Sequence, residues 1–409
     1  MNIQRRIVSI LCALLFAGFS QAALADEGIG QDGVAGHLKV MTQNLYVGAD
    51  LFQIIEGEPE EVPGIVASIF GEIQATNFRE RAEAIADQVA KQRPHLIGLQ
   101  EVSLIRTQCP DDIVFPPNIL APNATDVYAD YLQILMDALA ARGLYYEIAA
   151  TVIDLDAELP AANLGLELLE GCEYPLFDAR LTDRDVVLRR SDVEITSPPY
   201  SDNYTYNLAV PTAAGPIVFY RGYNIVDVVV NKRNYRFVNT HLEVNENPAA
   251  IFFQALQADE LTQILAAMAD GVSDEVLVVV GDFNSDPADG LIVDCLLPPD
   301  FTTLGSCPTS HTLMTSADYI DTWTVRNGAP HDGYTCCQDT LLNNDESELD
   351  GRYDYVWVHE PFGGAEGPAF LRGMQVTVVG EELRDRTVSW LWPADHAGVV
   401  AGMTIRQKK

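Results

Sequence analysis

Side chains able to bind a metal ion or transfer a proton occur at the ends of apolar runs along this chain. In VVVGDFNSDP, at 278–287, a run of valines stops and is followed by Asp282 and Asn284. Residues i and i+2 of an extended chain point to the same side, so these two side chains are expected to project together. The same kind of ending recurs at Asn44, Gln100, Glu101, Asn239, His241, Asp354, Asp395 and His396.

Each of these residues taken alone has an ordinary structural explanation. Asn44 suits a turn, Glu101 a helix cap and His241 a hydrogen-bonded core position. Together they are harder to explain, because an unpaired carboxylate buried beside valines and isoleucines costs several kcal/mol. A divalent cation would neutralise such a cluster, and oxygen ligands suit hard ions. We therefore expect a divalent metal cofactor, Mg²⁺ in the first place and Mn²⁺ or Ca²⁺ as alternatives.

These residues must be positioned by a set of strands and helices that the hydrophobic pattern predicts. Strands are expected at 38–46, 95–102, 144–152, 184–190, 223–231, 235–244, 275–283, 353–359, 374–380 and 394–405. Helices are expected at 78–93, where Pro94 ends the helix, at about 126–142 and at 249–269. Between the strand at 144–152 and residue 178 we expect an irregular excursion rich in Pro, Asp and Glu. The turn at Lys232–Asn234 predicts a hairpin.

The N-terminal segment 1–25 has the features of a secretory signal peptide. Two arginines precede an apolar stretch, and ALA at 23–25 has the form of a signal-peptidase site. The apolar stretch is short for a bilayer span, and an uncleaved anchor is the alternative. We expect an exported protein, secreted or periplasmic, without a stable membrane anchor. The remainder, 26–409, suits a single domain with an enlarged region at about 103–215.

The chain is strongly acidic. Its formal net charge is −34. Removal of 1–25 would make it −36, because that segment holds two arginines and no acidic residue. Such a surface repels nucleic-acid phosphates and anionic membranes at low salt. Solubility in a salty medium would favour the same composition, so the charge alone selects no function.

Seven cysteines are present, and six remain after the signal peptide is removed. An even number in an exported chain indicates disulfide bonds. Cys109 and Cys172 lie in one Pro- and Asp-rich region, and we expect them to pair. The other four, Cys295, Cys307, Cys336 and Cys337, allow three connectivities, one of which joins the neighbours at 336 and 337. A zinc site is the weaker alternative, because no C-x-x-C motif occurs.

The ordered motifs QNL, LQEV, NTHLE, GDFNSDP, RYDYV and ADHAGV resemble those of the endonuclease/exonuclease/phosphatase superfamily. The resemblance extends from about 39 to 402, and GDFN and the last DH are its most specific parts. It implies an α/β (α+β) fold in which two packed mixed β-sheets are flanked by helices in a four-layer sandwich. It also implies metal-assisted hydrolysis of a phosphoester, that is, a Mg²⁺-dependent phosphodiesterase.

The resemblance assigns three residues to the metal. Glu101 is implied as the principal ligand, with Asn44 beside it, and Asp395 supplies a further contact. These oxygen donors agree with the hard cation expected from the strand ends.

The same resemblance implies the catalytic residues. His396 is the general base that activates water, and Asp354 orients its ring through the other nitrogen. Asp282 and Asn284 position the nucleophile and the phosphoryl oxygens. His241 donates a hydrogen bond to developing charge or protonates the leaving group. How the acid and base roles divide among Asp282, His241 and His396 stays open.

The substrate is less well defined than the reaction. A nuclease acting on nucleic acid is the first expectation, and Arg184 lies in one of the basic clusters, at 180–190, that would bind its phosphates. A sphingomyelinase-like phospholipase C acting on a phospholipid headgroup is the alternative, with Trp390 and Trp392 at the interface or on the substrate. These residues also have plainer explanations: a solvated strand-edge charge for Arg184, and core packing for Trp390 and Trp392. A catalytically silent binding module that kept the fold is a third possibility, and the oligomeric state stays open.

Overall fold

The computed structural model describes residues 35–405 except 113–121, 164–167, 213–214, 246, 270–274, 299–300, 329–332 and 360–369. The predicted signal peptide, 1–25, lies outside the described residues. Among the helices of the described part, none combines the length and apolar character needed to cross a bilayer.

The first of two large sheets has eight strands. They are β1 (His37–Asn44), β2 (Leu96–Gln100), β3 (Leu104–Gln108), β4 (Asp126–Asp130), β5 (Tyr146–Ala162), β6 (Leu176–Arg190), β18 (Leu371–Val379) and β19 (Gly398–Ile405). Their order is β18-β19-β1-β2-β6-β3-β4, and β5 pairs with β6 beside this path. β1 and β2 run parallel, and the other pairs are antiparallel.

The second sheet has seven strands. They are β7 (Glu194–Ile195), β8 (Tyr200–Asn203), β11 (Gly222–Val230), β12 (Arg233–His241), β13 (Val276–Asp282), β16 (Tyr319–Asp321) and β17 (Asp354–His359). Their order is β16-β17-β13-β12-β11-β7, with β8 also paired to β11. Here β12 and β13 form the parallel pair. Two small hairpins, β9 (Leu208–Thr212) with β10 (Gly215–Phe219) and β14 (Ile292–Leu297) with β15 (Thr303–Pro308), stand apart.

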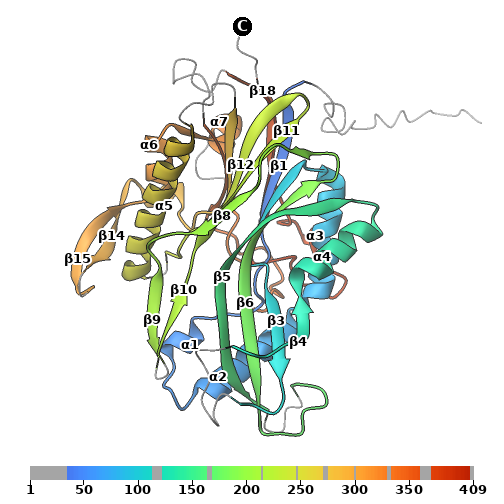
Figure 1. Cartoon of the computed structure of the whole chain (residues 1–409), viewed down its shortest axis with the longest axis vertical. Helices are drawn as coiled ribbons and strands as arrows, with labels where there is room; N and C mark the ends of the chain where they lie inside the picture. Colours follow the sequence, from blue (N-terminus) through green and yellow to red (C-terminus); the bar gives the residue numbers. More distant parts are fainter. Residues whose placement is uncertain are drawn as a thin grey trace, which may run out of the picture.

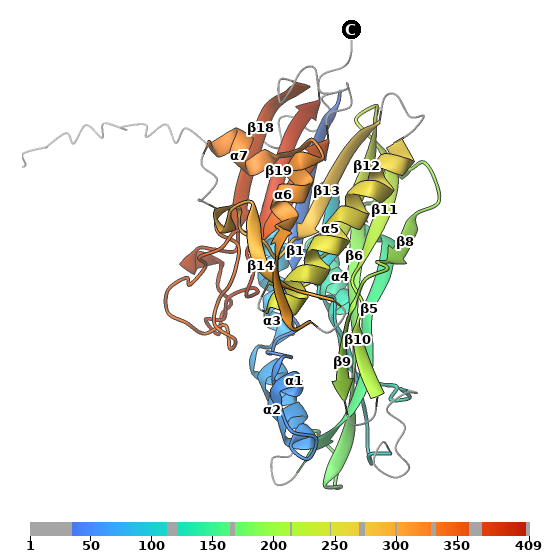
Figure 2. The same ribbon diagram turned by 90° about the vertical axis from the view of Figure 1, so that its left-hand side faces the viewer.

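Helices cover the outer face of each sheet, which gives the four layers that the resemblance implied (Figures 1 and 2). The helices are α1 (Gln53–Glu56), α2 (Val62–Ala75), α3 (Phe78–Gln92), α4 (Tyr131–Ala141), α5 (Pro248–Ala269), α6 (Ser310–Ser316) and α7 (Thr322–Asn327). α2, α3 and α4 pack on the eight-stranded sheet, while α5 and α6 pack on the seven-stranded sheet. A valine-rich core fills the space between the sheets. The predicted fold class is therefore confirmed.

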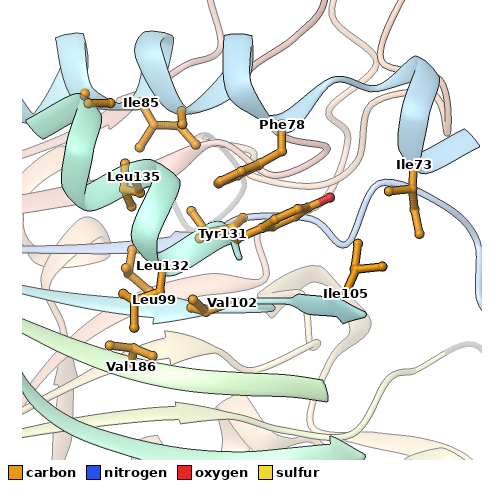
Figure 3. Close-up of a cluster of buried hydrophobic side chains, with 14 of the residues drawn as sticks. Ile73, Phe78, Ile85, Leu99, Val102, Ile105, Tyr131, Leu132, Leu135 and Val186 are labelled. Carbon is orange, nitrogen blue, oxygen red and sulfur yellow. The ribbon is translucent and has the colours of Figure 1, made fainter. Parts of the chain in front are cut away.

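The core beneath α3 and α4 shows why these segments are helical. Ala82, Ile85, Ala86 and Val89 recur at helical spacing and are buried. Figure 3 shows Phe78 of α3 facing Tyr131 at the start of α4, and their rings stack with centroids 3.7 Å apart. The described core thus fixes both helices against the sheet that carries β1 and β2.

Two predictions in the enlarged region are wrong in part. Residues 126–130 form β4 and not the first turn of a helix, because they pair with β3 and Asp130 then caps α4 by accepting a hydrogen bond from Leu132 N. The expected excursion between 152 and 178 is strand over much of its length, because β5 continues to Ala162 and pairs with β6 from Leu176, whereas the described residues 163 and 168–175 are irregular as predicted. Pro160 is tolerated because β5 is a sheet edge, where a strand can lack an outward N–H group.

Gly281 provides a test of how the end of β13 is built. Its φ is +149°, and a Cβ there would clash with the carbonyl oxygen of Thr240 on β12. We expect Gly281→Ala to lower the free energy of unfolding by about 3 kcal/mol or more, measured by denaturant titration. Gly143→Ala is the matched control, with φ +71° and no atom within 4 Å of the added Cβ. Its free energy of unfolding should fall by only about 1–2 kcal/mol. Equal losses in the two variants would contradict this explanation.

Candidate active site

The polar strand ends meet at one cavity of about 350 Å³. Six of the residues singled out in the sequence line it: Glu101, His241, Asp282, Asn284, Asp395 and His396. Asn44 and Asp354 are buried directly behind this wall and contact its residues. The structure therefore brings together all eight residues assigned to the metal and to catalysis.

Strand register explains the convergence. β1 and β2 run parallel with Asn44 opposite Gln100, and β12 and β13 run parallel with His241 opposite Asp282. β17 then pairs antiparallel with β13, which sets Asp354 opposite Asp282. The carboxyl ends of parallel strands meet at one edge of a sheet, so residues far apart in sequence arrive at the same cavity.

A buried hydrogen bond joins the two sheets behind the cavity. Gln100 Nε2 of β2 donates to Asn239 Oδ1 of β12 over 2.6 Å, and both side chains are fully buried. Gly98 permits this close approach, because a Cβ there would clash with the Asn239 carboxamide. Gln100 and Asn239, which the sequence marked as polar strand ends, therefore fix the spacing of the sheets.

Asp282 is the residue on which the site converges. Its Oδ2 accepts a hydrogen bond from Asn44 Nδ2 at 3.2 Å and lies 3.6 Å from His241 Nε2 and 3.7 Å from His396 Nε2. Its Oδ1 accepts from the backbone N–H of Asn284 at 2.9 Å. Burial raises the pKa of Asp282 to about 7, His396 opposes that shift, and the Asp354 carboxylate adds to it.

His396 is held by a carboxylate on one side of its ring. Its Nδ1 lies 2.7 Å from Asp354 Oδ2, which leaves Nε2 facing Asp282 and the cavity. Burial disfavours the charged ring. The carboxylates of Asp354, Asp282 and Asp395 outweigh that cost and raise the His396 pKa well above its ordinary value. This arrangement fixes the ring orientation and, once the ring is neutral, favours the tautomer with the proton on Nδ1.

Two of the residues assigned to the metal, Glu101 and Asp395, line the cavity, and Asn44 lies behind Glu101. Glu101 follows β2 at a positive φ of +53°. Its Oε1 accepts from Asn44 Nδ2 at 2.9 Å and its Oε2 from Val47 N at 2.8 Å, while Asn44 Oδ1 accepts from Tyr46 N. Asp395 is half-buried, desolvation raises its pKa to about 7, and its Oδ1 has no partner among the described residues. The carboxylates of Glu101 and Asp395, with this orphaned oxygen, fit a hard divalent cation.

Arg221 is a site residue that the sequence reading missed. It precedes β11 and lines the cavity, with Nη1 3.1 Å from His241 Nδ1 and Nη2 3.3 Å from Glu243 Oε1. Burial, followed by the positive charges of Arg221 and His396, lowers the pKa of His241 well below its ordinary value. His241 is therefore neutral at neutral pH. The only sequence signal was a lone Arg before a strand, in YRGYN.

A second group of missed residues makes one side of the cavity acidic. Asp154 of β5 and Asp183 of β6 line it, and neither Asp154 oxygen has a hydrogen-bond donor among the described residues. Burial raises the pKa of both, that of Asp183 to about 7. Asp154 was missed because its strand was expected to end at residue 152.

Three disulfides occur among the described residues. The predicted Cys109–Cys172 bond is confirmed. Of the connectivities left open for the other four cysteines, the structure has Cys295–Cys307 and the neighbouring pair Cys336–Cys337. Both members of that pair line the cavity, and Cys337 Sγ lies 3.9 Å from His396 Nε2.

The three residues predicted to bind substrate do not line the cavity. Arg184 is held by Asp130 at 2.7 Å and by the carbonyl oxygen of Val102. Trp392 is fully buried, and its Nε1 donates to the Asn344 carbonyl, so the core-packing explanation holds for it. Trp390 is 66% exposed on the surface.

Comparison with known proteins gives distant matches among solved structures. No family model and no curated protein matches the sequence. Among solved structures, the chain is similar to an endonuclease/exonuclease/phosphatase of Beutenbergia cavernae DSM 12333, with 17% identity and a TM-score of 0.48 over 90% of this chain and 72% of that one. It is also similar to an endonuclease/exonuclease/phosphatase family protein of Leptotrichia buccalis C-1013-b, with 13% identity and a TM-score of 0.46 over 90% and 99%.

A third similar structure is D. rerio TDP2 complexed with a single strand DNA product, with 14% identity and a TM-score of 0.43 over 90% of this chain and 98% of that one. The first two structures carry the name of the superfamily whose motifs the sequence resembles. At these identities and TM-scores, the activity of this chain has to be inferred from its own site.

The raised pKa of Asp282 gives a stability prediction for the metal-free protein. Its value is about 7 in the folded state and near 3.8 in the unfolded state. The folded state therefore keeps a proton that the unfolded state loses, and stability falls as pH rises through this window. Asp282→Asn removes this pH dependence. The unfolding free energy of the variant minus that of the wild type should therefore increase by on the order of 2–4 kcal/mol from about pH 5 to pH 8.

The measurement is denaturant unfolding of both proteins with chelator at the two pH values. Comparing the variant with wild type at each pH cancels the repulsion among the many surface carboxylates, which both proteins share. A difference in unfolding free energy that does not change with pH would contradict the assignment.

Proposed function

We propose that this protein is a metal-dependent phosphodiesterase of nuclease type, with Mg²⁺ as its first candidate ion. The observation that carries the proposal is the His396–Asp354 pair, 2.7 Å apart, facing a cavity that the carboxylates of Glu101 and Asp395 also line. An imidazole base in one cavity with hard oxygen donors suits the attack of water on a phosphoester.

His396 acts as the general base in this proposal. In its neutral form it accepts a proton from water at Nε2, while Asp354 keeps the other proton on Nδ1 and stabilises the imidazolium that forms. Glu101 and Asp395 would hold the ion, and Asn44 would position Glu101 through its Nδ2 hydrogen bond. When bound, it supplies positive charge that neutralises the phosphoryl oxygens and lowers the proton affinity of His396.

His241 is assigned as a hydrogen-bond donor to the developing negative charge. Because Arg221 lies 3.1 Å away and burial keeps the ring neutral, His241 has no readily released proton for a leaving group. Asp282, with a pKa of about 7, is the better source of that proton. This assignment divides the roles that the motifs left open.

The charge of the cavity favours a diester substrate over a monoester. Seven carboxylates line the cavity: Asp50, Glu101, Asp154, Asp183, Glu243, Asp282 and Asp395. Among its described lining residues, Arg221 is the one Arg or Lys side chain. A single arginine and one divalent ion can neutralise the single charge of a phosphodiester, whereas a dianionic monoester requires more cationic side chains.

Export forms part of the proposal. Three disulfides in the described part of the chain suit an oxidising compartment, as does the predicted signal peptide at 1–25. A secreted or periplasmic enzyme would meet nucleic acid or phospholipid outside the cytosol.

A phospholipid headgroup is the second candidate substrate, because one segment exposes apolar side chains. Val388 is 89% exposed and Trp390 66%, four and two residues before buried Trp392. Such side chains can enter a membrane interface.

The proposal is tested by nicking of supercoiled plasmid with Mg²⁺ and with chelator. We expect metal-dependent nicking that falls by about 10³-fold in His396→Ala, because the base is lost. His311→Ala is the matched control, since His311 lies on α6 outside the cavity, and it should keep wild-type activity. Full nicking by folded His396→Ala would overturn the role given to this residue.

A folded, metal-binding protein that nicks no DNA would direct the test to lipid. Trp390→Ala should then reduce hydrolysis of headgroups in phospholipid vesicles at least about tenfold, but leave hydrolysis of a soluble diester unchanged. Absence of Mg²⁺ or Mn²⁺ uptake by calorimetry, with no effect of Glu101→Gln, would instead favour a binding module that kept the fold.

A further inference from the structure

A second acidic cluster lies outside the candidate active site, where β3, β5 and β6 adjoin. It consists of Asp112, which follows β3, Glu158 of β5 and Asp178 of β6. Asp178 lies opposite Gln108 of β3 in the strand register. None of the three cluster residues lines the cavity that holds His396.

The three carboxylates are close enough to share one ion. One ligand oxygen from each lies within 4.8 Å of the other two. Ca²⁺ binds oxygen at about 2.3–2.6 Å, so ligands on opposite sides of it stand about 5 Å apart. The spacing of the cluster thus matches the coordination sphere of a calcium ion.

Buried oxygens without donors point toward a missing ligand. Asp178 is fully buried and Glu158 nearly so, while Asp112 is half-buried. Asp178 Oδ2 accepts from Asp112 N at 2.9 Å, and Asp112 Oδ2 accepts from Asn123 Nδ2 at 2.9 Å. The second oxygen of each, Oδ1, is buried and has no hydrogen-bond partner among the described residues. Both carboxylates therefore have one oxygen available to a cation.

Within the described residues, no Arg or Lys forms a direct ion pair with these three carboxylates. The neighbouring arginines, Arg106 and Arg180, both pair with Asp156, Arg180 at 2.6 Å, and attract Glu158 only at longer range. Asp111 adds a further carboxyl group beside Asp178. Three buried or half-buried carboxylates without a direct ion pair are costly, and a divalent cation would offset the cost.

We propose that Asp112, Glu158 and Asp178 bind a Ca²⁺ ion that clamps the segment after β3 to the β5–β6 hairpin. Only oxygen donors are present, which excludes a zinc-type site. The ligands come from three separate segments, and the half-buried side at Asp112 admits water to complete the coordination, which suits the flexible geometry of Ca²⁺ better than that of Mg²⁺.

The clamp has a structural purpose that the fold makes visible. The Cys109–Cys172 disulfide joins the same two regions three residues before Asp112 and six before Asp178. Two residues that line the cavity, Asp154 and Asp183, lie on the same β5 and β6 strands. The ion would therefore stabilise a hairpin that also forms one wall of the candidate active site.

The experiment separates this site from the active-site metal by working in a Glu101→Gln background. After metal removal, Ca²⁺ binding is measured by equilibrium dialysis and the unfolding midpoint with and without CaCl₂. We expect the Glu101→Gln protein to bind one Ca²⁺. Its unfolding midpoint should rise by about 3 °C when Ca²⁺ is at a hundredfold excess over Kd. Adding Asp178→Asn should abolish both effects.

Asp112→Asn in the same background is the second variant. Because Asp112 is half-buried, its substitution should disturb folding less than that of the buried Asp178. It should weaken Ca²⁺ binding at least about tenfold, and Mg²⁺ at the same concentration should give a smaller midpoint shift. Absence of bound Ca²⁺ in folded Glu101→Gln would overturn the proposal. Unchanged Ca²⁺ binding in folded variants of Asp178 or Asp112 would overturn it too. The result is independent of any phosphodiesterase activity.

Discussion

The meeting of polar side chains at Asp282 Oδ2 is the interaction on which the site depends. Asn44 comes to it from the eight-stranded sheet, His241 from the neighbouring strand of the seven-stranded sheet, and His396 from the segment before β19. These contacts require the sheets to lie face to face at a fixed spacing. The Gln100–Asn239 hydrogen bond sets that spacing behind the cavity, and Gly98 allows it. A change in the packing of either sheet would therefore move the reacting groups relative to one another.

Uncompensated negative charge is the second constraint on this molecule. Asp282 and Asp395 lie beside His396, and desolvation raises the pKa of each carboxyl to about 7. Burial also raises the pKa of Asp154 and Asp178 on the β5–β6 hairpin. Such groups destabilise a metal-free protein at neutral pH and give divalent cations a reason to bind. Stability and the proposed activity would then both depend on the same ions.

Much of this organisation is visible in the sequence. GDFN and the last DH have few structural explanations, and Asp282 and Asn284 line one cavity as expected. Strand alternation is not the reason, because β13 ends at Asp282 and Asn284 has a positive φ of +49°. Other parts have no local signal. Residues 126–130 join a helix pattern but form β4, because pairing with β3 outweighs local preference. Asp154 lies at the start of a Pro- and acid-rich segment whose composition does not predict a strand, although it forms part of the edge strand β5. Arg221 reaches His241 only through the β11–β12 pairing, which composition and spacing do not reveal.

The central claim is that a divalent ion and the His396–Asp354 pair share one site. Calorimetric titration of Mg²⁺ at neutral pH, in two buffers of different ionisation enthalpy, counts the protons released per ion. Without metal the His396 ring is protonated, and the ion should displace that proton. We predict release of about one proton per Mg²⁺ in the wild-type protein and a clear reduction in His396→Ala. Mg²⁺ binding that releases no proton, or the same number in both proteins, would contradict the claim.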